Sequence, residues 1–247
     1  MAAKIIKELH GFSGNQIFLM DKHGKLFVRK IGTISRNVER LTALYKKFPV
    51  PKIFNSTADR IDMEYIHGLD IKSFLISHHY ENLLQFLIKI LDNFSKTTNL
   101  KNYTNVYHTK LEEISFEMFP FTKEELIARL PVELPCSNYH GDLTLENIIY
   151  TEDRGFFLID AVTIDYDSYI FDIAKLRQDL ECKWFLRNSS AMLDNKLKNI
   201  QTQIFLRYPN ANNDYLLILM LLRVYKHAKA NTLEHDFLIR EITKLWK

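Results

Sequence analysis

The residues with the clearest chemical potential lie in one short stretch, residues 139–150, which is followed by an apolar run that ends at Asp160. Asp142 and Asn147 stand in a polar segment directly before a strand-like sequence. A turn at residues 152–155 then predicts a β-hairpin, which returns Asp160 to the same end of the sheet as Asn147. The spacing therefore predicts that two oxygen ligands, one amide and one carboxylate, converge.

This pair of ligands has a recognisable chemistry. Amide and carboxylate oxygens suit a hard cation such as Mg²⁺, which keeps waters and takes its remaining ligands from nucleotide phosphates. A further carboxylate, that of Asp142, can then face a substrate hydroxyl. In phosphoryl transfer, one Asp orients the attacking hydroxyl and accepts its proton. The three side chains thus meet the needs of a phosphoryl-transfer site.

The segments before this stretch have a strand-rich pattern. Strands are expected at residues 4–10, 16–20, 25–31, 52–55 and 60–65, and one helix at residues 35–48. Pro49 and Pro51 close that helix. We therefore expect a small antiparallel sheet packed on one helix.

From Asp70 onward the hydrophobic period changes to that of helices. Asp70 is the expected N-cap of the first helix, and residues 122–125 form a capping box before another helix. Core or surface helices are expected at residues 82–94, 126–130, 172–186, 191–206, 214–230 and 233–246. The expected architecture is α+β, with a sheet lobe over residues 1–66 and a larger, mainly helical lobe over residues 67–247.

The order of these motifs resembles a known family. The pattern H-G-D-x-x-x-x-N, followed by an apolar strand and Asp, is similar to the catalytic core of the aminoglycoside phosphotransferase and choline kinase family. Those proteins are small-molecule kinases with a bilobal, protein-kinase-like fold. Four more segments resemble its nucleotide loop, its lysine strand, its adenine linker and the helix that braces the catalytic loop: residues 11–15, 26–30, 63–68 and 171–176.

The resemblance implies a role for each matching residue. Asp142 would be the catalytic base, and Asn147 and Asp160 would hold Mg²⁺. His140 and Asp172 would support the loop, with Asp172 accepting hydrogen bonds that fix its backbone. ATP would be bound by residues of the sheet lobe: Gly11, Ser13, Gly14, Lys30, Glu39, Glu64 and Tyr65.

Two assignments within the nucleotide site stay open. Glu39 is the only carboxylate between Asp21 and Asp59, so it is the candidate partner of Lys30, although the interval is short for a strand, a turn and a helix. Strand alternation places Lys30 and Arg29 on opposite faces, and a shift of one residue would exchange them. We prefer Lys30 because residues 27–30 resemble the lysine strand of kinases.

A second polar cluster, residues 163–168, follows the metal-binding strand where an acceptor would approach. Asp165 and Asp167 are its candidate acceptor-binding residues. Alternatively, residues 163–168 form a solvent-exposed loop without a binding role.

Composition and charge exclude several classes of protein. The 33 basic and 30 acidic residues give a formal charge of +3, without the concentrated basicity of a nucleic-acid binder. Cys136 and Cys182 form no metal or disulfide motif, which favours a reduced cytoplasm. The longest apolar run, residues 215–222, is far shorter than the roughly 20 residues of a spanning helix. We expect a soluble, unprocessed cytoplasmic protein without stable membrane association.

The function that the resemblance implies is an ATP- and Mg²⁺-dependent phosphotransferase acting on a hydroxyl of a small molecule. A sugar or surface-polysaccharide precursor is favoured as the acceptor, and an amino alcohol such as choline or an aminoglycoside stays open. Ala161 and Val162 follow Asp160, so the D-F-G triplet of protein kinases is absent.

Two alternatives remain. An atypical small protein kinase or ATPase is kept open by Leu143 and Thr144, which match the loop of some such enzymes. The second is a non-catalytic pseudokinase that serves as a binding module. Such a protein would lack at least one of four polar residues that the sequence retains: Lys30, Asp142, Asn147 and Asp160.

Overall fold

The computed structural model describes residues 3–9, 14–96 and 99–247 of the chain. It divides into two compact units, Met1–Phe74 with Glu146–Ile164, and Leu75–Leu145 with Asp165–Lys247. The first unit thus contains, besides the expected sheet lobe, a later hairpin of the chain.

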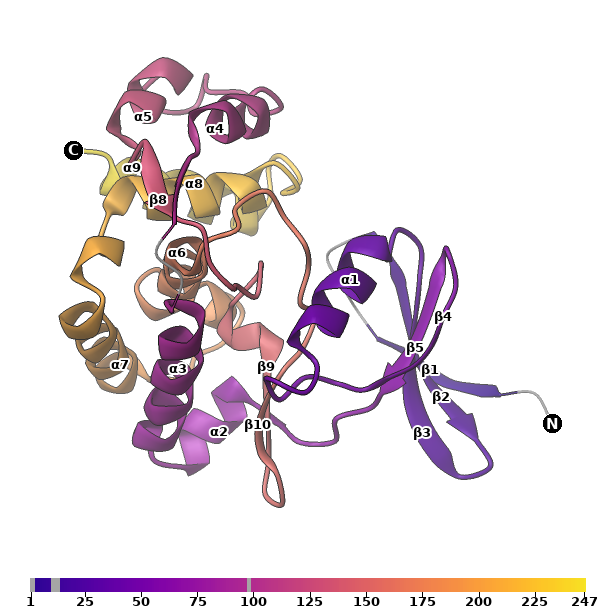
Figure 1. The fold of residues 1–247 in the computed structure, drawn as a ribbon. Coiled ribbons are helices and arrows are strands. Elements are labelled where there is room, and N and C mark those ends of the chain that lie inside the picture. The colour runs from indigo at the N-terminus through magenta and orange to yellow at the C-terminus, as the bar shows by residue number, and fades with distance from the viewer. Residues whose placement is uncertain (1–2, 10–13, 97–98) are drawn as a thin grey trace. The chain divides into compact units, whose positions relative to one another are not determined.

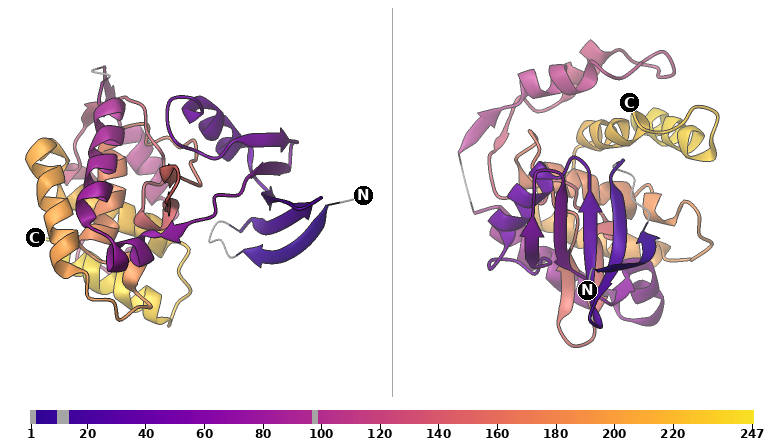
Figure 2. Two further views of the ribbon diagram at one scale, coloured as in Figure 1. Left: turned by 90° about the horizontal axis from the view of Figure 1, so that it is seen from below. Right: turned by 90° about the vertical axis from the view of Figure 1, so that its right-hand side faces the viewer.

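The first unit is built on a five-stranded antiparallel sheet of order β1-β2-β3-β5-β4, whose strands are seen side by side in the right-hand view of Figure 2. Its strands are β1 (Lys4–Leu9), β2 (Gln16–Lys22), β3 (Lys25–Ile31), β4 (Ile53–Ser56) and β5 (Arg60–Glu64). The antiparallel sheet expected from the sequence is confirmed.

The helix of this unit, α1 (Ser35–Leu44), lies beside the sheet (Figure 1). Its buried residues are Asn37, Arg40, Leu41 and Leu44, which is the spacing of one helix face. The helix ends four residues before the expected Phe48, because Tyr45 is extended and Lys46 has a left-handed φ of 71°.

A second, three-stranded sheet completes the first unit. It has the order β10-β9-β6 and consists of β6 (Leu69–Asp70), β9 (Ile148–Thr151) and β10 (Gly155–Leu158). The rings of Phe74, Tyr150 and Phe156 pack together, with centroids 4.7–5.0 Å apart. Gly68 allows the close approach of β6, because a Cβ there would lie 2.1 Å from the carbonyl oxygen of Tyr150.

The second unit is mainly helical. Its helices and short strands are α3 (Tyr80–Phe94), β7 (Leu100–Asn102), α4 (Thr104–Leu111), α5 (Lys123–Arg129), β8 (Glu133–Pro135), α6 (Tyr169–Leu180), α7 (Asp194–Arg207), α8 (Asp214–Tyr225) and α9 (Leu233–Leu245). Helix α2 (Ile71–Ser77) spans the division between the units, as does the 3₁₀ turn η1 (Leu145–Asn147). Two more 3₁₀ turns are η2 (Trp184–Leu186) and η3 (Pro209–Ala211).

Helix α6 is the buried centre of this unit. All of its residues except the first are buried, and it packs against both α7 and α8. The helix begins at Tyr169, three residues before the start expected from the sequence, because the hydroxyl of Ser168 caps it by accepting from Ile170 N. It ends at Leu180, and Lys183 with a φ of 59° separates it from η2.

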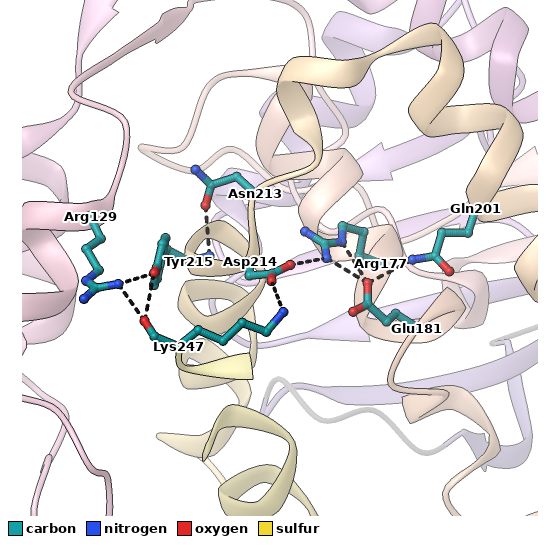
Figure 3. Close-up of polar contacts among 8 residues, drawn as sticks. All are labelled: Arg129, Arg177, Glu181, Gln201, Asn213, Asp214, Tyr215 and Lys247. Atoms are coloured by element: carbon teal, nitrogen blue, oxygen red, sulfur yellow. Dashed lines mark hydrogen bonds and ion pairs between the residues drawn. The ribbon is translucent and has the colours of Figure 1, made fainter. Parts of the chain in front are cut away.

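A polar network anchors α6 to α8 (Figure 3). The Arg177 guanidinium, whose side chain is 2% exposed, donates to Glu181 and to Oδ1 of Asp214, each at 2.8 Å. At the start of α8, Asn213 Oδ1 accepts from Tyr215 N at 2.9 Å and caps the helix. The carboxylates of Glu181 and Asp214 thus compensate the buried charge of Arg177.

The remaining helix expectations are confirmed with shifted ends. The capping box of Thr122 and Glu125 is present, and Asp70 Oδ1 accepts from Ser73 N at 2.7 Å. Strands β6, β7 and β8 were not expected, because two or three residues are too few to carry a periodic signal. Within the described part of the chain, no helix is long and apolar enough to cross a membrane.

Candidate active site

In the first unit, Lys30 and Asp160 form an ion pair in which the lysine is buried and the aspartate is partly exposed. The Nζ atom of Lys30 lies 2.6 Å from Oδ1 of Asp160, and the lysine side chain is only 3% exposed. The neighbouring Arg29 instead pairs with Asp62 on β5 through two bonds of 2.7 Å. Because neighbouring residues of a strand point to opposite faces, only Lys30 of these two residues reaches Asp160.

The hairpin places Asn147 and Asp160 at the same end, as the sequence predicts. Leu158 pairs with Ile148, and Ile159 N then donates to the carbonyl oxygen of Asn147 at 2.9 Å. Asp160 has a left-handed φ of 55°, which is uncommon for a residue other than glycine. Such local strain is concentrated at functional sites.

Asn37 of α1 takes the inward position that was expected of Glu39. Its amide donates to Asp160 Oδ1 at 3.1 Å and to the carbonyl oxygen of Ala161 at 3.0 Å. Glu39 is exposed, and no ion pair joins it to Lys30 among the residues that the structure describes. Residues two apart on a helix point in nearly opposite directions, so Asn37 and Glu39 cannot both face inward.

The spacing of the sequence could have identified Asn37. It precedes the apolar residues Leu41 and Leu44 by four and seven positions, which places all three on one helix face. The ion-pair partner of Lys30 is Asp160 rather than Glu39, and Asn37 contacts that partner from α1.

The other residues expected to bind the nucleotide contact other parts of this unit rather than Lys30 or Asp160. Glu64, at the end of β5, accepts from Arg154 Nη1 at 2.6 Å and from Lys52 N at 3.2 Å. The Tyr65 ring lies edge-on to His67, with centroids 6.0 Å apart. Gly14 has a positive φ of 72°. Gly11 and Ser13 lie outside the described residues.

In the second unit, two carboxylates of α6 hold the loop that carries Asp142. Asp172 accepts from His140 N at 2.5 Å and from Gly141 N at 2.9 Å, as the sequence predicts. Asp179 accepts from Leu145 N at 2.6 Å. The two aspartates are two helical turns apart and so lie on the same face of α6. The seven-residue spacing from Asp172 is the sequence signal that identifies Asp179 as a second brace.

Lys175, also on α6, faces the carboxylate of Asp142. Its Nζ lies 3.3 Å from Asp142 Oδ1 and 3.1 Å from Gln178 Oε1, and its side chain is 8% exposed. Burial alone raises the pKa of Asp142, but the charges of Lys175 and Arg223 outweigh burial and hold this pKa below its ordinary value. Asp142 is therefore ionised at neutral pH. Burial lowers the pKa of Lys175, and Asp142 partly opposes that effect.

The two candidate acceptor residues have partners within the second unit. Asp167 accepts from Lys101 Nζ at 2.6 Å and from the Tyr103 hydroxyl at 3.0 Å. Asp165 pairs with Lys110 at 2.6 Å, and its side chain is 52% exposed. Asp167 thus fastens β7 to the segment before α6, whereas Asp165 is accessible to a ligand.

The residues of the hairpin fit a magnesium ion. The hydrogen bonds that Lys30 and Asn37 donate to Asp160 both go to Oδ1, and the Asp160 side chain is 40% exposed. Together with Asn147 it would supply the oxygen donors that Mg²⁺ prefers, and nucleotide phosphates and water would be the remaining ligands. Among the described residues, no group of three or more His, Cys, Asp and Glu could hold a metal by itself.

Comparison of this chain with solved structures identifies its fold. The apo form of a thermostable mutant of aminoglycoside phosphotransferase APH(4)-Ia aligns with a TM-score of 0.65 and 10% identity over 99% of this chain and 94% of that chain. A thermostable mutant in ternary complex with AMP-PNP and hygromycin B gives 0.55 and 12%, over 99% and 94%. Choline kinase LicA from Streptococcus pneumoniae gives 0.60 and 15%, over 99% and 92%.

The chain has the protein-kinase-like fold of small-molecule kinases. No family model and no curated protein sequence matches it. The kinase-like fold accounts for the order of the motifs, from the lysine strand to the hairpin and α6.

Proposed function

We propose that the protein transfers the γ-phosphate of ATP to a hydroxyl group of a small molecule, with Mg²⁺ as cofactor. The observation that carries the proposal is the environment of Asp142. Its loop is fixed by Asp172 and Asp179, and Lys175 keeps its carboxylate ionised. An ionised, positioned carboxylate is what a phosphotransferase needs to receive the proton of the attacking hydroxyl.

In the proposed reaction, each polar side chain of the site has one role. The acceptor oxygen forms a bond to the γ-phosphorus while the bond from that phosphorus to the β,γ-bridging oxygen breaks, and ADP leaves. The hydroxyl proton passes to Asp142. Lys30 binds the nucleotide phosphates, and Asn147 and Asp160 hold Mg²⁺. The ion neutralises charge on the phosphates when it is bound.

The comparisons support ATP as the donor. A neighbour with this fold was solved with AMP-PNP, a nucleotide analogue, and with hygromycin B. A reaction that consumes ATP, together with two free cysteines, fits a cytoplasmic protein.

The test is ADP release from Mg·ATP over a panel of sugars, amino alcohols and aminoglycosides, with wild-type protein and Asp142→Asn. We expect acceptor-dependent ADP release by the wild type and a loss of at least 100-fold in kcat for the variant. Calorimetry should show Mg·AMP-PNP binding by both proteins.

Asp153→Asn is the matched control, because its side chain is 79% exposed on the hairpin. Full activity of Asp142→Asn would contradict the mechanism. The absence of nucleotide binding by the wild type would contradict the function itself.

A further inference from the structure

Helix α6 contacts the catalytic loop in the order in which the loop runs. Asp172 and Asp179 hold the loop through backbone N–H groups, one before Asp142 and one after it. Lys175 lies between these two aspartates, three positions after the first and four before the second. Positions three and four apart share one helix face, so all three side chains face the loop. The helix thus fixes the backbone with its two aspartates and contacts the side chain of Asp142 with Lys175.

The ammonium group of Lys175 has two fixed oxygen partners. Its Nζ lies 3.3 Å from Oδ1 of Asp142 and 3.1 Å from Oε1 of Gln178. The Lys175 side chain is 8% exposed and Gln178 is 1% exposed, so water competes little for these contacts. An ammonium carries three N–H donors, which is enough to serve both oxygens. Gln178 therefore orients Lys175, and Lys175 orients the carboxylate of Asp142.

The second partner of Lys175 is neutral. A carboxylate in place of the Gln178 amide would compete with Asp142 for the single positive charge of Lys175, and two carboxylates that share one site raise the pKa of one of them. The amide holds the ammonium group by hydrogen bonding and adds no charge. The charge of Lys175 thus acts on Asp142.

Charged groups of other elements also act on the pair. Burial raises the pKa of Asp142, and Lys175 has the largest effect in the opposite direction. Arg223 of α8 and His140 of the loop lower this pKa further. Burial lowers the pKa of Lys175, Asp142 opposes burial most strongly, Arg223 adds to it and Asp179 opposes it. Loss of Lys175 should therefore make Asp142 easier to protonate.

We propose that Lys175 is a positioning residue of the phosphoryl transfer, and that the neutral amide of Gln178 holds its ammonium group against Asp142. The inference rests on the proposed function and extends it to the residues that set the state of its base. Catalysis of phosphoryl transfer depends mainly on positioning and on stabilisation of charge. A fixed and ionised carboxylate is then more useful than a strongly basic one, and Lys175 supplies both properties.

The first experiment compares the wild-type chain with Lys175→Met. It uses Mg·ATP and the acceptor that gives the highest kcat/KM in the panel of sugars, amino alcohols and aminoglycosides. We expect kcat to fall about tenfold at about pH 8, because the carboxylate is less firmly oriented. The deficit should grow as the pH is lowered to about 5, because Asp142 is then protonated more readily. KM for Mg·ATP should change by less than about threefold, since Lys175 acts through Asp142.

Three further variants separate charge from packing. Lys175→Arg keeps the charge and should restore the pH dependence of the wild type. Gln178→Glu adds a carboxylate at nearly constant volume, so its kcat should fall more at about pH 5 than at about pH 8. Lys183→Met is the matched control, because it removes a lysine from an exposed ion pair with Asp194. Its kcat should match that of the wild type over the whole range.

Carbon-13 NMR of the aspartate carboxyl groups gives a measurement that needs no acceptor. The Asp142 signal, assigned by comparison with Asp142→Asn, should titrate at a higher pH in Lys175→Met than in the wild type. An unchanged titration in the folded variant, or a kcat deficit that is equal at every pH, would overturn the inference. If Lys175→Met does not fold, the Asp142 titration in Gln178→Glu decides in the same way. Failure of the wild type to bind Mg·AMP-PNP would instead refute the proposed function.

Discussion

The Nζ atom of Lys30 lies 2.6 Å from Oδ1 of Asp160, although 130 positions separate the two residues in the chain. The lysine belongs to the five-stranded sheet and the aspartate to the end of the hairpin. Both lie in the same compact unit, because the hairpin folds with the N-terminal segment. The pair therefore links the proposed nucleotide-binding strand to the proposed magnesium ligand.

Substitution of Lys30 and of Arg29 should separate nucleotide binding from stability. Lys30→Met removes the cation beside Asp160 and should weaken Mg·ATP binding at least tenfold in calorimetry. Arg29→Met breaks the partly exposed pair with Asp62 and removes the guanidinium that lies over the Phe27 ring. It should lower the free energy of unfolding by about 1 kcal/mol and leave nucleotide affinity within twofold. The reverse outcome would show that the two residues have exchanged roles.

Substitution of Asn37 should lower stability and Mg·ATP affinity, because Asn37 holds Asp160, whereas substitution of Glu39 should change neither. Asn37→Leu leaves the carbonyl oxygen of Ala161 without its donor and should cost about 1–3 kcal/mol of stability, measured by urea unfolding. Mg·ATP affinity should fall with it, because Asp160 is less firmly held. Glu39→Gln, at an exposed position, should change stability by less than about 0.5 kcal/mol. Equal effects of the two substitutions would argue against this assignment.

Asp172→Asn tests the brace of the catalytic loop. The carboxylate serves two backbone N–H groups, whereas the amide offers them a single acceptor oxygen. We expect a loss of about 1–3 kcal/mol in stability and a kcat reduced more than KM is changed. Steady-state kinetics and urea unfolding check both expectations, with Asp153→Asn as the control. An unchanged kcat in the folded variant would separate the brace from catalysis.

The Arg177 network should give stability that depends on pH. Burial raises the pKa of Asp214, but its hydrogen bond and charge interaction with Arg177 prevail, and this pKa lies below its ordinary value. A depressed carboxyl pKa stabilises the fold above the unfolded pKa of about 4 and loses that contribution as the pH falls through the folded pKa.

The test compares wild type with Asp214→Asn, two proteins that differ in this contribution. The difference in their free energies of unfolding should be about 1–2 kcal/mol at pH 7. It should shrink as the pH falls below the unfolded pKa of about 4 and through the lower folded pKa. A difference that stays constant over this range would assign the effect to packing. Arg177 keeps Glu181 as a partner, which limits the loss (Figure 3).

Local patterns in the sequence determined much of this protein. The alternating strands, the capping box at Thr122 and the helical periods follow from neighbouring residues alone. The hairpin placed Asn147 and Asp160 at one end, because antiparallel pairing fixes which residues face each other. The bracing hydrogen bonds of Asp172 were expected from the resemblance of the motif and are present.

Only the tertiary structure decided which side chains meet. In the structure Asn37, rather than Glu39, donates a hydrogen bond to Asp160, and Lys101 donates one to Asp167. The tertiary structure also placed Lys175 beside Asp142, from a helix that the sequence identified only as a brace. The physical reason is that periodicity is a property of adjacent residues, whereas an ion pair depends on how distant segments pack and on which polar groups that packing buries.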